Sequence, residues 1–247
     1  MDFSTAAPFD FLEAIDAGAP IVVLGGVHIG CYEFFARAGI RNITELKGKT
    51  IGLNASPSAL LILMAAQVGL DPSKDIHWIT PADSKVNPLD LFVQGKIDGF
   101  LGFAPEPQEV RSHHVGRVIA STASDRPWSQ YFCCLLAGNR EFARRNPVET
   151  KRVLRAILKA ADLGLAEPAR VARRIVEAGF SPCYDFALQA LSDIQYDRWR
   201  DYDPEDTLRF YALRMREAGL IKALPTRIIE ENTDWHFFNA LKRELKA

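Results

Sequence analysis

Short apolar runs alternate with amphipathic stretches over the first two thirds of the chain. Strands are predicted where the sequence reads DFST, IVVL, TIGL, IHWI, IDGFLGF, RVIAS and YFCCLLA, at residues 2–5, 21–24, 50–53, 76–79, 97–103, 117–121 and 131–137. Three- and four-residue apolar spacing predicts helices at about 6–17, 58–68 and 88–94. Strands that alternate with helices in this way indicate an α/β fold with helices covering the faces of a sheet.

From about residue 147 onward the pattern becomes almost entirely helical. The stretch NPVETKRVLRAILKAADLGL places its apolar residues at helical spacing on one face. A later helix is predicted to begin with Asp203 as its N-cap and Pro204 at its first position, and to end at Gly219. The stretch TDWHFFNALKRELK predicts a last amphipathic helix. The C-terminal region is therefore expected to be helical.

Composition and charge narrow the class of protein. The chain has 247 residues, 48% of them hydrophobic, which is enough for one large or two modest cores. Its net charge of -1 argues against nucleic acid or an anionic membrane as a partner. The chain lacks an apolar run long enough to span a bilayer, and its start lacks the basic and apolar segments of a secretory signal.

Three loops that follow predicted strands are candidates for ligand binding. The loop NASPS places Ser56 and Ser58 at a helix start, where backbone N–H groups and hydroxyls can bind an anion or a polar group. The simpler alternative is that one of these serines only caps the helix. Similar strand-to-helix loops follow DFS at the start of the chain and GFLGF at Phe103. Ligands in open α/β sheets bind beyond the carboxyl ends of strands, so the three loops are expected to converge.

Catalytic and metal-binding arrangements are weakly supported. His28 and Cys31 could form a nucleophile pair, but nothing in the sequence supplies the third, orienting group. Cys133 and Cys134 are neighbours in a predicted strand, so their side chains should point to opposite faces and should not hold one metal ion. We therefore predict no catalytic residue, no metal ligand and no cofactor. The aromatic residues near 32–35 and 128–132 line either the core or a ligand cleft.

Two longer stretches resemble a known family. The sequences ITELKGKTIGLNASPSALLILMAAQVGLDPSKDIHWI and LFVQGKIDGFLGFAPEP resemble the substrate-binding proteins of nitrate/sulfonate/taurine-type ABC importers, the NMT1/THI5-like group. The resemblance extends over essentially the whole chain. It implies the two-lobe periplasmic-binding-protein type II fold, with lobe one at 1–44 and 138–247, lobe two at 45–127, and a return crossover at 128–137.

The start of the chain departs from the family pattern. The resemblance places DFST after a strand–helix–strand unit and a further helix, so lobe one is expected to be incomplete. Exposed strand edges would then favour a homodimer through this lobe. The resemblance implies a periplasmic protein, whereas the chain as given carries no signal peptide and would be cytoplasmic.

The resemblance also implies a function and a set of binding residues. A small anionic or aromatic molecule would be gripped by hinge closure and delivered to the permease of an ABC importer, without covalent chemistry. The alternatives are an iron-dependent pyrimidine-precursor synthase of the same fold, which carries a cysteine-rich motif, and a cytosolic ligand sensor or fragment. The residues carried over as ligand-binding are Thr5, Ala6, Gly26, His28, Ser56, Pro57, Ser58, Phe103, Ala104 and Glu106.

Overall fold

The computed structural model describes residues 2–53, 59–80 and 87–245, which form two compact units. Unit one comprises Met1–Gly30, Ser129–Val171 and Ile194–Ala247, and unit two comprises Cys31–Trp128 and Ala172–Asp193. These boundaries differ from those of the predicted lobes, because residues 31–44 and 172–193 group with unit two. Among the helices described, none is long and apolar enough to cross a membrane.

Unit one is built on a three-stranded antiparallel sheet. Its order is β1 (Phe3–Ala6), β8 (Phe132–Asn139) and β2 (Ile21–Ile29), so the strand that comes last in sequence lies in the middle. The predicted strand at 21–24 is thus longer than expected and runs through Gly25 and Gly26. Register shifts interrupt the β2–β8 pairing, and two of them are bulges on either side of His28, one after Gly26 and one before Ile29.

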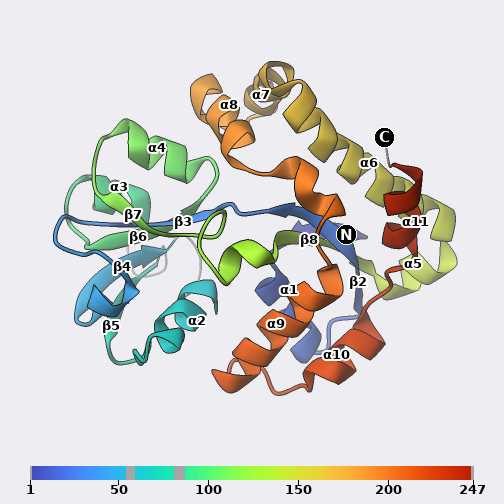
Figure 1. The fold of residues 1–247 in the computed structure, drawn as a ribbon, viewed down its shortest axis with the longest axis horizontal. Coiled ribbons are helices and arrows are strands. Elements are labelled where there is room, and N and C mark those ends of the chain that lie inside the picture. Colours follow the sequence, from blue (N-terminus) through green and yellow to red (C-terminus); the bar gives the residue numbers. More distant parts are fainter. Residues whose placement is uncertain (1, 54–58, 81–86, 246–247) are drawn as a thin grey trace. The chain divides into compact units, whose positions relative to one another are not determined.

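Helices cover the sheet of unit one. They are α1 (Pro8–Asp16), α5 (Arg140–Arg145), α6 (Pro147–Ala166), α9 (Pro204–Glu217), α10 (Pro225–Asn232) and α11 (His236–Glu244), together with the 3-10 turn η3 (Tyr196–Arg200). In Figure 1, α9 packs against α1 and α10, while α6 packs against α11. The predicted cap of α9 is confirmed, since the Asp203 carboxylate accepts the N–H of Glu205 at 2.9 Å. Gly219 follows this helix with a positive φ of 73°, as a glycine stop requires.

Unit two contains a five-stranded mixed sheet. Its order is β5 (Ile76–Ile79), β4 (Lys49–Leu53), β6 (Gly99–Phe103), β3 (Tyr32–Ala36) and β7 (Arg117–Ser121). The helical elements of its sequence range are η1 (Ile43–Leu46), α2 (Ala59–Gln67), α3 (Pro88–Val93), α4 (Glu106–Ser112) and α8 (Tyr184–Asp193). Helix α7 (Pro168–Glu177) and the turn η2 (Trp128–Gln130) span the boundary between the units. Strand β3 pairs antiparallel with both β6 and β7, so it lies inside the sheet and β7 forms the edge on that side.

The core of unit two is centred on aromatic rings beneath α3. Phe92 of α3 and Phe100 of β6 are fully buried, with ring centroids 6.5 Å apart. Phe35 of β3 and Val110 of α4 belong to the same cluster. Strand β3 is therefore held by its apolar side chains as well as by its backbone.

The glycine pair of β2 allows two rings to lie directly on the backbone of unit one. A Cβ added at Gly25 would lie 2.6 Å from a ring carbon of Phe238, and one added at Gly26 would overlap the ring of Phe132. Both phenylalanines are fully buried, and their rings meet in an edge-to-face contact 6.4 Å apart. This packing explains why β2 continues through two residues of low strand propensity.

We predict that Gly26→Ala destabilises the protein by about 2 kcal/mol, because the buried Phe132 ring has no room to move away from a methyl group. Urea unfolding of the two proteins measures the loss. Gly138→Ala is the matched control in the same sheet, since its added Cβ would be 3.0 Å from the partly exposed ring of Phe3. Equal losses in the two variants would contradict the assigned role of Gly26.

Candidate functional site

The first candidate binding corner lies where β1 of unit one leads into α1. Thr5 is exposed and Ala6 is partly exposed at the end of the strand, and Ala7 then caps the helix. The carboxylate of Asp10 accepts the N–H of Ala7 at 3.3 Å, so the helix start carries its own acidic group. Burial raises the pKa of Asp10, and the Ala7 hydrogen bond opposes that effect. We call Thr5, Ala6, Ala7 and Asp10 the first corner.

The second candidate binding corner lies where β6 of unit two leads into α4. The ring of Phe103 is 49% exposed at the end of the strand, and its centroid lies 5.9 Å from that of Tyr32 on β3. The Glu106 carboxylate folds back over the strand and accepts the N–H of Phe103 at 3.1 Å. We call Tyr32, Phe103, Ala104 and Glu106 the second corner.

Glu106 is the most strongly perturbed carboxyl group of the second corner. Its pKa is raised from an ordinary 4.5 to about 7: burial raises it most, the hydrogen bond from Phe103 lowers it, and the nearby Glu109 charge raises it by less than burial does. Near neutral pH the group is therefore divided between its protonated and charged forms. It can donate or accept a hydrogen bond, which suits a carboxyl group that faces a polar ligand.

The only cation of α4 is already paired within unit two. The Arg111 guanidinium donates to the carboxylate of Asp193 on α8 at 2.5 Å and also to that of Glu33 on β3. Gln108 donates to the same Asp193 at 2.9 Å. Burial raises the pKa of Glu33, and the charge of Arg111 opposes that rise. Arg111 thus ties α8 to the sheet, and its charge is balanced by two carboxylates rather than directed at a ligand.

The remaining residues carried over from the family have different surroundings. Gly26 is buried under the Phe132 ring, and this packing leaves no room for a side chain at the position. His28 lies between two bulges of β2, and its ring centroid is 5.1 Å from that of Tyr196. The segment with Ser56, Pro57 and Ser58 lies outside the described residues. The assignment of all ten residues to ligand binding stays a prediction.

The cysteines differ in state. Cys31 and Cys133 are disulfide-bonded, whereas Cys134 and Cys183 are free. A disulfide sulfur is not a nucleophilic thiolate, which argues further against a His28–Cys31 pair. Burial lowers the pKa of His28 to about 4 and raises that of the Cys134 thiol to about 12, so both groups are neutral at pH 7.

The expectation that Cys133 and Cys134 cannot share one metal ion is wrong. Their sulfur atoms lie within 4.8 Å of each other and of a ring nitrogen of His28. The physical reason is the bulge in β8: Ile29 pairs with Phe132 and His28 with Cys134, which leaves Cys133 as the extra residue. A bulge breaks the strict alternation of side chains on which the prediction depended.

Sequence reasoning missed two features, one in the first corner and one in the helix that follows the second corner. Asp10 makes only one half of a capping box, by accepting the N–H of Ala7, because the alanine methyl group cannot return a hydrogen bond as a serine or threonine would. The pairing of Arg111 with Glu33 and Asp193 joins residues 78 and 82 positions apart in the chain. No local pattern signals such a long-range pairing.

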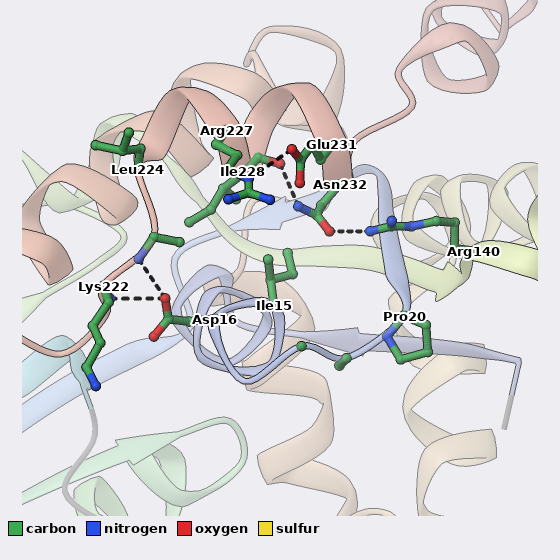
Figure 2. Close-up of a pocket in the computed structure, with 13 residues that line it drawn as sticks. Ile15, Asp16, Pro20, Arg140, Lys222, Leu224, Arg227, Ile228, Glu231 and Asn232 are labelled. Carbon is green, nitrogen blue, oxygen red and sulfur yellow. Dashed lines mark hydrogen bonds and ion pairs between the residues drawn. The ribbon is translucent and has the colours of Figure 1, made fainter.

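Unit one also contains a pocket of about 540 Å³ at the C-terminal end of α1 (Figure 2). Its polar groups largely satisfy one another. Asp16 accepts the N–H groups of Lys222 and Ala223 at 3.0 and 2.7 Å, and Arg227 pairs with Glu231 at 2.9 Å. Because α1 begins at the first corner and runs away from it, this pocket lies at the opposite end of the helix.

We predict that the free energy of unfolding falls as pH rises from about 4.5 to about 7, with Glu106 as one cause. Its folded pKa is raised, so in that window the folded state holds a proton that the unfolded state has lost. The loss amounts to at most about 3 kcal/mol, because part of the side chain meets solvent. Glu106→Gln keeps an acceptor for Phe103 and should flatten the profile by that amount. Parallel pH profiles of the two proteins would contradict the assignment.

Comparisons with solved structures establish the fold. The periplasmic aliphatic sulphonate-binding protein SsuA from Escherichia coli superposes with a TM-score of 0.70 and 19% identity, over 92% of this chain and 74% of that chain. The periplasmic nitrate-binding protein NrtA from Synechocystis PCC 6803 gives 0.72 and 12%, over 100% and 74%. The desulfurization enzyme DSZB gives 0.61 and 16%, over 98% and 85%. The chain therefore has the predicted α/β periplasmic-binding-protein type II fold.

The comparison with protein families tests the resemblance drawn from the sequence, whereas the solved structures show only the fold. No curated protein sequence matches the chain. The family model described as NMT1/THI5 like matches residues 1–171, which is more than half of the 247 residues. This match confirms the resemblance drawn from the sequence, and the chain belongs to the NMT1/THI5-like family.

Proposed function

We propose that this protein is the solute-binding component of an ABC importer, which captures a small aromatic molecule and presents it to a membrane permease. The observation that carries the proposal is that each of the two units has its own strand-to-helix corner, at Thr5–Ala7 and at Phe103–Glu106. A protein that closes on its ligand needs one such surface on each moving part. The sulfonate- and nitrate-binding proteins of the same fold support this role.

The chemistry of the corners favours an aromatic ligand over a simple inorganic anion. The first corner carries Asp10 at the helix start, where a bound anion would otherwise benefit from the helix dipole. The second corner presents the half-exposed ring of Phe103 beside Tyr32, with the Glu106 carboxyl group next to them. Aromatic faces attract a planar ligand, and a carboxyl group with a pKa near 7 can bond to its polar edge.

Binding alone accounts for this role. Hinge closure needs only a ligand that binds the closed form better than the open form. In this proposal Phe103 and Tyr32 stack on the ligand, Glu106 fixes its orientation, and Thr5 with Ala6 completes the contact from unit one. The segment that contains Ser56 and Ser58 is proposed to add hydroxyl groups.

We predict that a thermal-shift screen with aromatic carboxylates, pyrimidines, sulfonates and nitrate identifies an aromatic ligand. At a concentration one hundred times its Kd, that ligand should stabilise the protein by about 2.7 kcal/mol. Phe103→Ala should weaken its binding about tenfold, because the ring contact is lost. Phe180→Ala is the matched control, since its ring is 78% exposed in unit two, outside the corner. A response to nitrate alone, or equal binding by both variants, would overturn the aromatic assignment.

We further propose that the protein forms a homodimer through β1. This strand pairs with β8 and with no other strand among the described residues, so one of its backbone edges is open. Open edges favour pairing with another chain.

Multi-angle light scattering should therefore give twice the monomer mass at micromolar concentration. Ser4→Lys places a charge on the exposed edge strand and should shift the protein toward monomer. Ser192→Lys is the matched control, because it adds the same charge at an exposed position of α8 in unit two and should leave the mass unchanged. A monomer at every concentration would refute the dimer without affecting the binding role.

A further inference from the structure

Unit one gathers an imidazole and two sulfur atoms at one point of its sheet. A ring nitrogen of His28 and the Sγ atoms of Cys133 and Cys134 all lie within 4.8 Å of one another. The two bulges beside His28 create this arrangement, since they bring His28 opposite Cys134 and leave Cys133 as an extra residue beside it. In a regular antiparallel pair, adjacent cysteines would lie on opposite faces of the sheet.

The His28 ring has an unused ligand atom. Its Nδ1 is buried and has no hydrogen-bond partner among the described residues. Buried polar atoms in folded proteins are nearly always paired, so an orphaned nitrogen on an imidazole ring that lies beside two sulfur atoms needs an explanation. A metal ion would satisfy it, because neutral imidazole nitrogen and thiolate sulfur are the ligands that zinc prefers.

We propose that unit one binds a zinc ion through His28, Cys133 and Cys134 when the disulfide that involves Cys133 is reduced. Separations below 4.8 Å are compatible with ligands on a tetrahedral ion, because Zn–S bonds are about 2.3 Å and Zn–N bonds about 2.0 Å long. Cys31 belongs to the same cluster, with its Sγ within 4.8 Å of the other three ligand atoms, and is the candidate for the fourth position. The complete set would be Cys₃His, a common structural zinc site.

Zinc binding at this site therefore depends on the redox state of the cysteines. With Cys133 in a disulfide, only His28 and the Cys134 thiol remain, which are too few ligands for tight binding. A trialkylphosphine transfers its electron pair to the S–S bond and, with one water molecule, yields two thiols and the phosphine oxide. Zinc then binds the sulfurs as thiolates, and each thiol that becomes a ligand releases a proton to the solvent. Zinc itself is neither oxidised nor reduced.

The test is zinc and cobalt binding by the whole chain with and without a phosphine reductant. After reduction, the protein should retain one zinc ion per chain through gel filtration, and Co²⁺ should give the charge-transfer band of cobalt–thiolate bonds. Without reductant it should retain none. Zinc should also raise the unfolding temperature of the reduced protein alone, because the ion binds only the folded site.

Variants separate this site from adventitious thiol binding. Cys134→Ser and His28→Gln should each weaken zinc binding about a hundredfold or more, and Cys134→Ser should also diminish the charge-transfer band. Cys183→Ser is the matched control, because it removes the other free cysteine, which lies outside unit one, and should leave binding unchanged. Should one variant fail to fold, the other and the control still decide. Absence of zinc from the reduced protein, equal binding with and without reductant, or equal losses in the Cys183→Ser protein would overturn the proposal.

Discussion

The sheet of unit one depends on the position of β8, which lies between the other two strands. The strand comes from residues 132–139 and inserts between β1 and β2, which lie more than 100 residues earlier in the chain. Without it, β1 and β2 have no backbone partner among the described strands, and α1 would lose the strand end that fixes its start. The Phe132 ring at the beginning of β8 packs on Gly26, so strand pairing and side-chain packing depend on the same few residues. The bulges in this part of the sheet also bring His28, Cys133 and Cys134 close together.

The two corners share a design but differ in their chemistry. Each follows a strand, begins a helix and places a carboxyl group close to that helix start, with Asp10 in one and Glu106 in the other. In both, burial raises the pKa of the carboxyl group, and in both a backbone N–H opposes the rise. Only the second corner adds exposed aromatic surface. In the proposed role, selectivity for an aromatic ligand would therefore come from the Phe103 and Tyr32 rings of unit two.

Much of the fold could be predicted from local patterns. Residues 76–79 form a strand with the bounds that the pattern predicts, because a short apolar run there is enclosed by polar turn residues. Strand β3 escapes prediction, since its sequence YEFFA is interpreted only as aromatic core or cleft lining. Strand β2 is predicted to end too early, before Gly25, because a glycine pair resembles a turn until the rings of Phe132 and Phe238 are seen on it.

The candidate site was less accessible to sequence reasoning. The ends of β1 and β6 can be located by their strand-to-helix pattern, but their electrostatics depend on burial and on partners distant in sequence. The sequence identifies Glu106 as a candidate residue but does not predict its raised pKa, which depends on burial. The pairing of Arg111 with Asp193 joins segments that no local sequence pattern connects. The proximity of Cys133 and Cys134 depends on a bulge, which shifts alternation by one residue without leaving a clear sequence signal.

Hydrogen–deuterium exchange with and without the aromatic ligand tests most directly whether this is a binding protein that closes on its solute. The account predicts that amides at Thr5–Ala7 in unit one and at Phe103–Glu106 in unit two gain protection together at the same ligand concentration. Protection confined to one unit, or at the pocket between α1 and α10 instead of the corners, would contradict it.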